Sequence, residues 1–151
     1  MEIKTMITDN GSGTYGISEA VRRVSAVKAG EALGLSGFYG SSKAYFLASC
    51  FKAAGRPMLV VLPTQEEAEG FCDDLRFFLG AQDVMLYPST ETLPFEPVSA
   101  HQELQASRME LLFNLTSGRS FITVSCASSL MQKVMPRSSL TQKVIELAKG
   151  G

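Results

Sequence analysis

The sequence is poor in the residues that most often form catalytic or metal sites. Its 151 residues include one histidine, His101, and three cysteines, Cys50, Cys72 and Cys126. A disulfide framework or a zinc site needs cysteines that are paired or closely spaced, and these three lie far apart in apolar stretches. We therefore expect reduced, buried thiols. No catalytic triad can be assembled around a histidine at the start of a helix, so a capping role is favoured for His101.

The chain also lacks an excess of basic residues. Its 14 lysines and arginines face 15 acidic residues, which gives a net charge of −1 and a pI of about 5.8. This balance argues against direct nucleic-acid binding, which usually needs a basic surface. The sequence has neither a run of roughly 18 apolar residues that could span a membrane nor an apolar signal segment at its N-terminus. We expect a cytoplasmic protein without membrane contact.

What remains is a globular composition, with 45% apolar and 19% charged residues. Residues 1–16 are rich in glycine, serine and threonine and predict a flexible arm. Residues 17–151 predict one α/β domain, in which apolar strands near 31–36, 57–63, 83–88 and 120–126 alternate with helices near 17–29, 42–54, 64–79, 101–115 and 127–134. This alternation predicts a mostly parallel sheet of four or five strands with helices on both faces.

Local signals fix several of these elements. Thr64 and Glu67 form a capping box at the start of the third helix, and Gly80 ends it. Gly55 is expected to end the helix before it. The apolar stripe of the third helix is expected to consist of Ala68, Phe71, Cys72, Leu75, Phe78 and Leu79. Ser18 is a candidate cap for the first helix. The apolar run PMLVVLPT predicts a strand that is covered on both faces. Pro94 and Pro97 predict a loop before the helix that begins near His101, whose core side is expected to carry Leu104, Leu111, Leu112 and Leu115.

Residues 37–44, GFYGSSKA, nearly match the phosphate-binding loop G-x-x-x-x-G-K-[ST]. Gly37 and Lys43 stand at matching positions. Ser42 replaces the second glycine and adds a Cβ where phosphate must approach the backbone. Ala44 replaces the hydroxyl residue and has no oxygen for Mg²⁺. The motif is therefore a degenerate P-loop.

A working loop also needs an acidic residue at the end of an apolar strand to complete the metal site. The three central strands end in other residues: Pro63 and Thr64, Pro88 and Ser89, Ser125 and Cys126. Gly37 and Gly40 retain part of the backbone freedom, and Lys43 retains the cation. We predict no ATP site, no catalytic residue and no metal ligand, but a structural strand–loop–helix joint with Lys43 on the surface. A simple anion at the helix N-terminus stays possible.

Two alternatives remain open. The first is a divergent P-loop NTPase that uses Gly37–Lys43 with metal ligands from Glu91 or Glu96. The second is a DNA-binding module, which would show steep salt dependence. Acidic residues near a helix start complement the helix dipole, so we expect structural roles for Glu91, Glu96 and Glu103. Arg108 is expected to pair with Glu103 or Glu96.

The proline-containing segment TETLPFEPVSAHQELQASRMELLFNLTSG resembles the bacterial transcription-repair coupling factor (Mfd) family. The family pattern has an E-T-L-P-[YF] segment, then S-P-H, an acidic residue, a serine and an arginine before a leucine-rich helix. The matching residues are Glu91, Thr92, Leu93, Pro94, Phe95, Ser99, His101, Glu103, Ser107 and Arg108. Two departures are Ala100 in place of the proline and Thr90 where an aromatic residue is common. RPMLVVLPTQEEAEGFCDDLRFFLG and SSLMQKVMPRSSL also look similar to this family, and the resemblance runs from about residue 30 to the end.

The resemblance implies a fold like the first domain of the excision-repair helicase UvrB, with the ATPase lost. It implies a non-catalytic scaffold that helps to recruit UvrA and restrains the motor. The full-length family protein is implied to be an ATP-dependent translocase on double-stranded DNA that displaces stalled RNA polymerase. ATP and Mg²⁺ would then belong to motor domains elsewhere, so we expect no cofactor in this region. We expect the chain to be an N-terminal fragment of such a protein.

Overall fold

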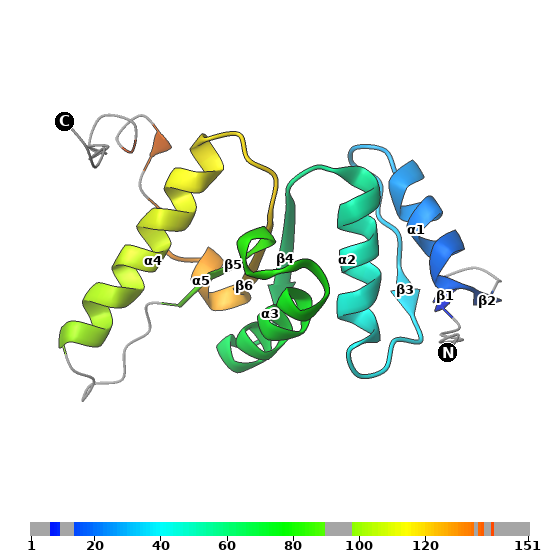
Figure 1. The fold of residues 1–151 in the computed structure, drawn as a ribbon, viewed down its shortest axis with the longest axis horizontal. Coiled ribbons are helices and arrows are strands. Elements are labelled where there is room, and N and C mark those ends of the chain that lie inside the picture. Colours follow the sequence, from blue (N-terminus) through cyan, green and yellow to red (C-terminus); the bar gives the residue numbers. More distant parts are fainter. Residues whose placement is uncertain (1–6, 10–13, 90–97, 135, 138–139, 141–151) are drawn as a thin grey trace.

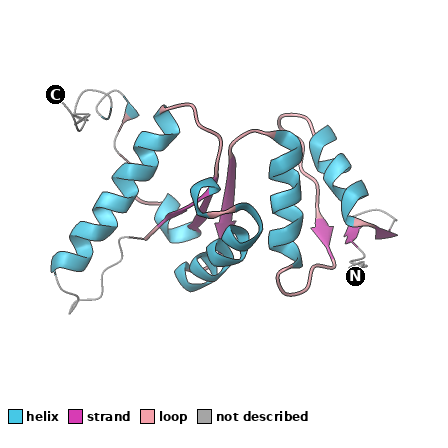
Figure 2. Ribbon diagram, viewed as in Figure 1, coloured by secondary structure: helices cyan, strands magenta, loops and turns pink. Residues whose placement is uncertain are grey.

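The computed structural model describes residues 7–9, 14–89, 98–134, 136–137 and 140. It confirms the α/β class: a parallel sheet is flanked by helices, and a smaller antiparallel sheet lies beside it (Figure 2). In the part of the chain described, no helix is long and apolar enough to cross a membrane.

The parallel sheet consists of β4 (Met58–Leu62), β5 (Val84–Tyr87) and β6 (Ile122–Cys126). Its order is β4-β6-β5, so the last strand in the sequence lies in the middle. All five residues of β6 are buried, because this strand has neighbours on both sides. The sheet is therefore organised around β6.

Helices α3 (Gln65–Leu79) and α4 (Val98–Thr116) cover opposite faces of this sheet. From α3, Ala68, Cys72 and Leu75 pack with one set of strand side chains: Val84, Ile122, Val124 and Cys126. From α4, Leu111 packs with Tyr87 and Phe121, which point the other way because strand side chains alternate. The short η1 (Ala81–Asp83) leads into β5, and α5 (Ala127–Leu130) follows β6.

Helix α2 (Ser42–Ala54) joins the parallel sheet to the remaining elements (Figure 1). Its Ala44 and Ala48 belong to the α3 core, whereas Phe46 and Cys50 pack with Ala20 of α1 (Ile17–Ala26). On that side β1 (Ile7–Asp9), β2 (Thr14–Tyr15) and β3 (Leu35–Ser36) form an antiparallel sheet in the order β2-β1-β3. Thus 7–9 and 14–15, within the segment expected to be a flexible arm, form short strands.

Several local predictions are confirmed. The Thr64 hydroxyl caps α3 by accepting the Glu67 backbone N–H at 3.2 Å. Gly55 ends α2 in the left-handed region, with φ of 61°. Along α3, the predicted apolar stripe consists of the buried and half-buried residues Ala68, Phe71, Cys72, Leu75, Phe78 and Leu79.

Other predictions need correction. β4 is not covered on both faces, because Leu59 is 58% and Val61 49% exposed. Both side chains share the face of Thr123 and Ser125, and α4 packs on that face against Tyr87 and Phe121. Leu115 is exposed rather than core-facing. Gly16 rather than Ser18 is the N-cap of α1, and β3 pairs with β1 instead of extending the parallel sheet.

Candidate functional site

Residues 37–44, which the sequence predicts to be a degenerate P-loop, have the predicted strand–loop–helix layout. β3 ends at Ser36, five residues form the loop, and α2 begins at Ser42. Gly37 and Gly40 adopt φ values of 91° and 52°. Side chains other than glycine are disfavoured there, so these two glycines are needed for the loop to turn.

The loop hydrogen-bonds to itself. The Tyr39 backbone N–H donates to Ser42 Oγ at 2.8 Å, and the Ser42 N–H donates to the Tyr39 carbonyl at 3.1 Å. In a working phosphate loop, free backbone N–H groups point at the phosphates. Here Ser42, which stands in place of the second glycine, accepts a hydrogen bond from one of these N–H groups. The substitution therefore adds bulk and also satisfies a group that phosphate would need.

Positions 43 and 44 differ in their burial. Lys43 is exposed, as predicted. Ala44 is 0% exposed and packs in the cluster that includes Ala48, Ala68 and Cys72. A hydroxyl at position 44 would lie in this apolar cluster, so exchanging the alanine for serine would not by itself create a metal ligand.

A second group of polar residues lies at the carboxyl end of the parallel sheet, where α/β proteins commonly bind ligands. Gln65, at the start of α3, links two strand ends through its Oε1. That oxygen accepts the Ser89 backbone N–H at 3.0 Å and the Cys126 thiol at 3.5 Å. Cys126 Sγ also lies 3.2 Å from Ser128 Oγ and 3.0 Å from Ser129 Oγ. This network holds the strand ends together.

The three thiols differ in their ionisation. Burial raises the pKa of Cys50 to about 11, and burial also raises that of Cys72. Burial likewise raises the pKa of Cys126, but hydrogen bonds with Ser128 and Ser129 outweigh it, so the net pKa is lowered. All three are free thiols and at most 1% exposed, as the sequence predicted. The burial of Cys126 separates it from an external substrate.

Arg108 of α4 is the most deeply buried charged residue among those described, with 6% exposure. Its guanidinium donates to Tyr87 Oη at 2.5 Å, to the Pro88 carbonyl at 2.8 Å and to Gln132 Oε1 at 2.7 Å. It also lies 4.2 Å from the centroid of the Tyr87 ring, in cation–π geometry. Arg108 thus ties α4 to the end of β5 and to the segment after α5.

The expected pairing of Arg108 with Glu103 is wrong, since Arg108 points into the core and the Glu103 side chain is exposed. A signal for this burial existed in the sequence: Arg108 follows Leu104 by four residues and precedes Leu111 by three, so it lies on the apolar stripe. Glu91, Glu96 and the His101 side chain lie outside the described residues. The alternative with metal ligands from Glu91 or Glu96 stays a prediction without a structural test.

Within the described ranges, no group of three or more metal-binding side chains occurs, and every buried side-chain nitrogen or oxygen has a hydrogen-bond partner. The polar groups that the structure brings together satisfy one another. Gln65 and Tyr87 were missed from the sequence, because neither belongs to a chemical motif.

Comparison with known proteins finds relatives of one kind. A transcription-repair-coupling factor of Haemophilus influenzae is 40% identical over 72 residues, which cover 48% of this chain and 6% of the relative. That of Escherichia coli K12 is 30% identical over 132 residues, covering 87% of the chain and 11% of the relative. That of Myxococcus xanthus is 29% identical over 134 residues, covering 84% and 11%.

The chain therefore spans about a tenth or less of the length of these relatives. No family model matches the sequence, and no solved structure matches it.

Proposed function

Along most of its length this chain belongs to the transcription-repair-coupling-factor family, and from this premise we propose that it is a non-catalytic scaffold module of such a protein. The module would have a UvrB-like role: it would bind other proteins, help to recruit UvrA and restrain the motor. Its location would be the cytoplasm. ATP hydrolysis, double-stranded DNA translocation and contact with RNA polymerase would belong to other parts of the full-length protein.

One observation carries the non-catalytic part of the proposal: the loop's own serine takes up a loop N–H. Ser42 Oγ accepts the Tyr39 N–H, and Ala44 is buried in the core. A nucleotide would have to break this hydrogen bond and would still find no hydroxyl for Mg²⁺. Lys43 supplies a positive charge, but a single charge does not position a triphosphate.

A second observation supports the protein-binding part. Leu59 and Val61 expose large apolar side chains on neighbouring positions of one sheet face. Among the described strands, β4 pairs only with β6, so one of its edges has no strand partner there. Exposed apolar surface next to an open edge is typical of a surface that contacts further protein.

Calorimetry tests the absence of a nucleotide site. We expect no Mg·ATP binding at millimolar nucleotide, no hydrolysis, and an unchanged melting temperature in Lys43→Ala. Micromolar affinity that is lost in Lys43→Ala would overturn the scaffold proposal in favour of an NTPase.

A pulldown with purified UvrA tests the interaction role. It should use the 151-residue chain alone and then extended by about one hundred residues of the longer protein, roughly one further domain. Leu59→Lys with Val61→Lys should weaken retention of any partner that contacts the β4 face. Phe77→Lys is the matched control, because Phe77 is also exposed (84%) but lies on α3. Failure of both lengths to retain UvrA would refute UvrA recruitment by this module.

A further inference from the structure

The outer edge of β5 is open. β5 pairs with β6 on one side, and no strand in the described part of the chain pairs with the other. In a strand, alternate residues direct their N–H and C=O groups to the two sides, so part of the β5 backbone faces outward without a strand partner. The edge therefore offers main-chain donors and acceptors to an added strand.

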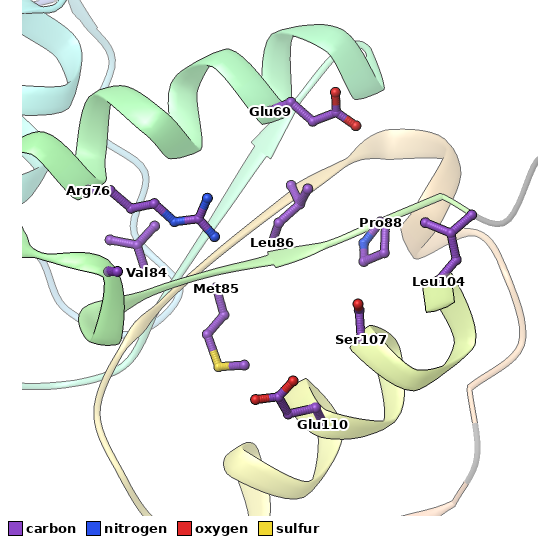
Figure 3. A pocket seen from close by; sticks show the side chains of 10 residues that line it. Glu69, Arg76, Val84, Met85, Leu86, Pro88, Leu104, Ser107 and Glu110 are labelled. Atoms are coloured by element: carbon purple, nitrogen blue, oxygen red, sulfur yellow. The ribbon is translucent and has the colours of Figure 1, made fainter. Parts of the chain in front are cut away.

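This edge lies at the bottom of a groove between α3 and α4 (Figure 3). The groove has a volume of about 410 Å³, within the range of ligand-binding clefts. Val84, Met85 and Leu86 of β5 form its floor, with Leu104 of α4 at one end. Four residues of strand extend over about 13 Å, so the floor matches an extended peptide of four or five residues.

The described side chains that line the walls of the groove include more acidic than basic residues. Glu69 lines the α3 wall and Glu110 the α4 wall, and both are exposed. Among the described lining residues, Arg76 is the one basic side chain and pairs with Asp73 at 3.3 Å, while Glu69 Oε1 accepts the Gln65 side-chain N–H at 2.7 Å. The walls thus present two carboxylates on opposite sides of an open strand edge. This disfavours nucleic acid and favours a cationic peptide.

We propose that the β5 edge binds an extended segment of a partner protein, added as a further strand, in which two adjacent basic residues direct their side chains to opposite faces and apolar residues flank them. The main chain of the segment would pair with β5, and its basic side chains would reach Glu69 and Glu110. When a strand is added to a sheet edge, main-chain hydrogen bonds provide the affinity and the alternating side chains provide the specificity. The inference rests on the proposed protein-binding role and assigns one surface and one ligand chemistry to it.

The probe is a blocked synthetic peptide, acetyl-Thr-Val-Lys-Arg-Val-Thr-amide, titrated into the ¹⁵N-labelled 151-residue chain; its adjacent lysine and arginine point to opposite faces of an extended strand. We expect amide shifts centred on residues 84–87 that saturate with peptide. Two control peptides should bind weakly: one with glutamate in place of the basic residues, and one with proline in place of the valines, which removes backbone donors.

Charge reversal tests the wall residues. Glu69→Lys combined with Glu110→Lys should weaken the basic peptide about tenfold, since two exposed charge pairs become repulsive. The matched control, Glu66→Lys combined with Glu103→Lys, makes the same charge change on the same two helices outside the groove and should leave affinity unchanged.

The inference is overturned by absence of β5 shifts at millimolar peptide, by shifts centred elsewhere, or by equal effects of the two charge-reversed variants. If the amide shifts of β5 change with protein concentration in the absence of peptide, the edge binds a second copy of the chain, and the partner-segment proposal is wrong. If the first variant does not fold, the three peptides on the unmodified chain decide the outcome. The peptide titration does not involve UvrA or nucleotide, so its outcome is independent of the UvrA pulldown and the calorimetry, and the two proposals can fail separately.

Discussion

Replacing Arg108 with alanine should strongly destabilise the protein. The substitution leaves three acceptors without their donor: Tyr87 Oη, the Pro88 carbonyl and Gln132 Oε1. Tyr87 and Pro88 are buried, and a buried polar group that loses its partner costs about 1–3 kcal/mol. Gln132 is half-buried and can turn towards water. Removing the guanidinium also removes the desolvation penalty of the buried charge, which offsets part of this loss of stability. We expect a net loss of about 3 kcal/mol.

Urea unfolding measures this loss directly. With an m-value of about 2 kcal/mol/M, a loss of about 3 kcal/mol lowers the midpoint by about 1.5 M. Arg76→Ala is the control, because Arg76 makes an exposed pair with Asp73 and exposed pairs contribute at most about 1 kcal/mol. Arg108→Lys should fall between the two, since lysine keeps the charge but not the planar fork.

The reasoning fails if Arg108→Ala unfolds within about 0.3 M of the unmodified protein, or if it matches Arg76→Ala. Either result would mean that the surrounding acceptors find water or new partners, so that the buried guanidinium contributes nothing net. A changed m-value would instead point to an altered native or unfolded state.

Three further predictions concern the cap, the thiols and the loop. Thr64→Ala should cost about 1 kcal/mol in urea unfolding because α3 loses its cap, whereas Ser18→Ala should change stability by less than about 0.5 kcal/mol. Since folding raises the pKa of Cys50 from 9.0 to about 11, its contribution to stability is complete below pH 9 and is lost as pH rises towards 11; the stability of Cys50→Ala should decline less steeply over this range, and a decline as steep as that of the unmodified protein would contradict this. Ser42→Gly combined with Ala44→Ser should not create Mg·ATP binding in calorimetry, because position 44 is buried, and heat of binding in the micromolar range would refute this.

Much of the fold could be predicted because its elements carry local signals. The Thr64 cap, the α3 stripe and the glycine stops at Gly55 and Gly80 each act within a few residues, and the structure places them as expected. That the loop is a degenerate P-loop stays a prediction, which rests on Ser42 and Ala44. These inferences needed no knowledge of which strands become neighbours.

The errors concern long-range placement. An apolar run such as MLVVL predicts a strand, but its composition does not reveal that Leu59 and Val61 stay exposed on one face. The sequence of β3 likewise does not show that it pairs with β1 rather than with the parallel sheet. Arg108 was expected to pair with Glu103 or Glu96 because of its charge, although its position on the apolar stripe indicated burial. At such a position the charge of the residue suggests exposure, whereas its apolar neighbours on the helix suggest burial. Tertiary packing determines which of the two occurs.

The order of strands in the parallel sheet has a consequence for synthesis on the ribosome. β4 and β5 emerge first, yet neither pairs with the other, and each finds its hydrogen-bonding neighbour only in β6. A nascent chain that stops before residue 122 therefore presents two apolar strands with no partner between them. We expect such truncated chains to aggregate or to need chaperones, and cooperative folding to begin only once 122–126 have left the exit tunnel.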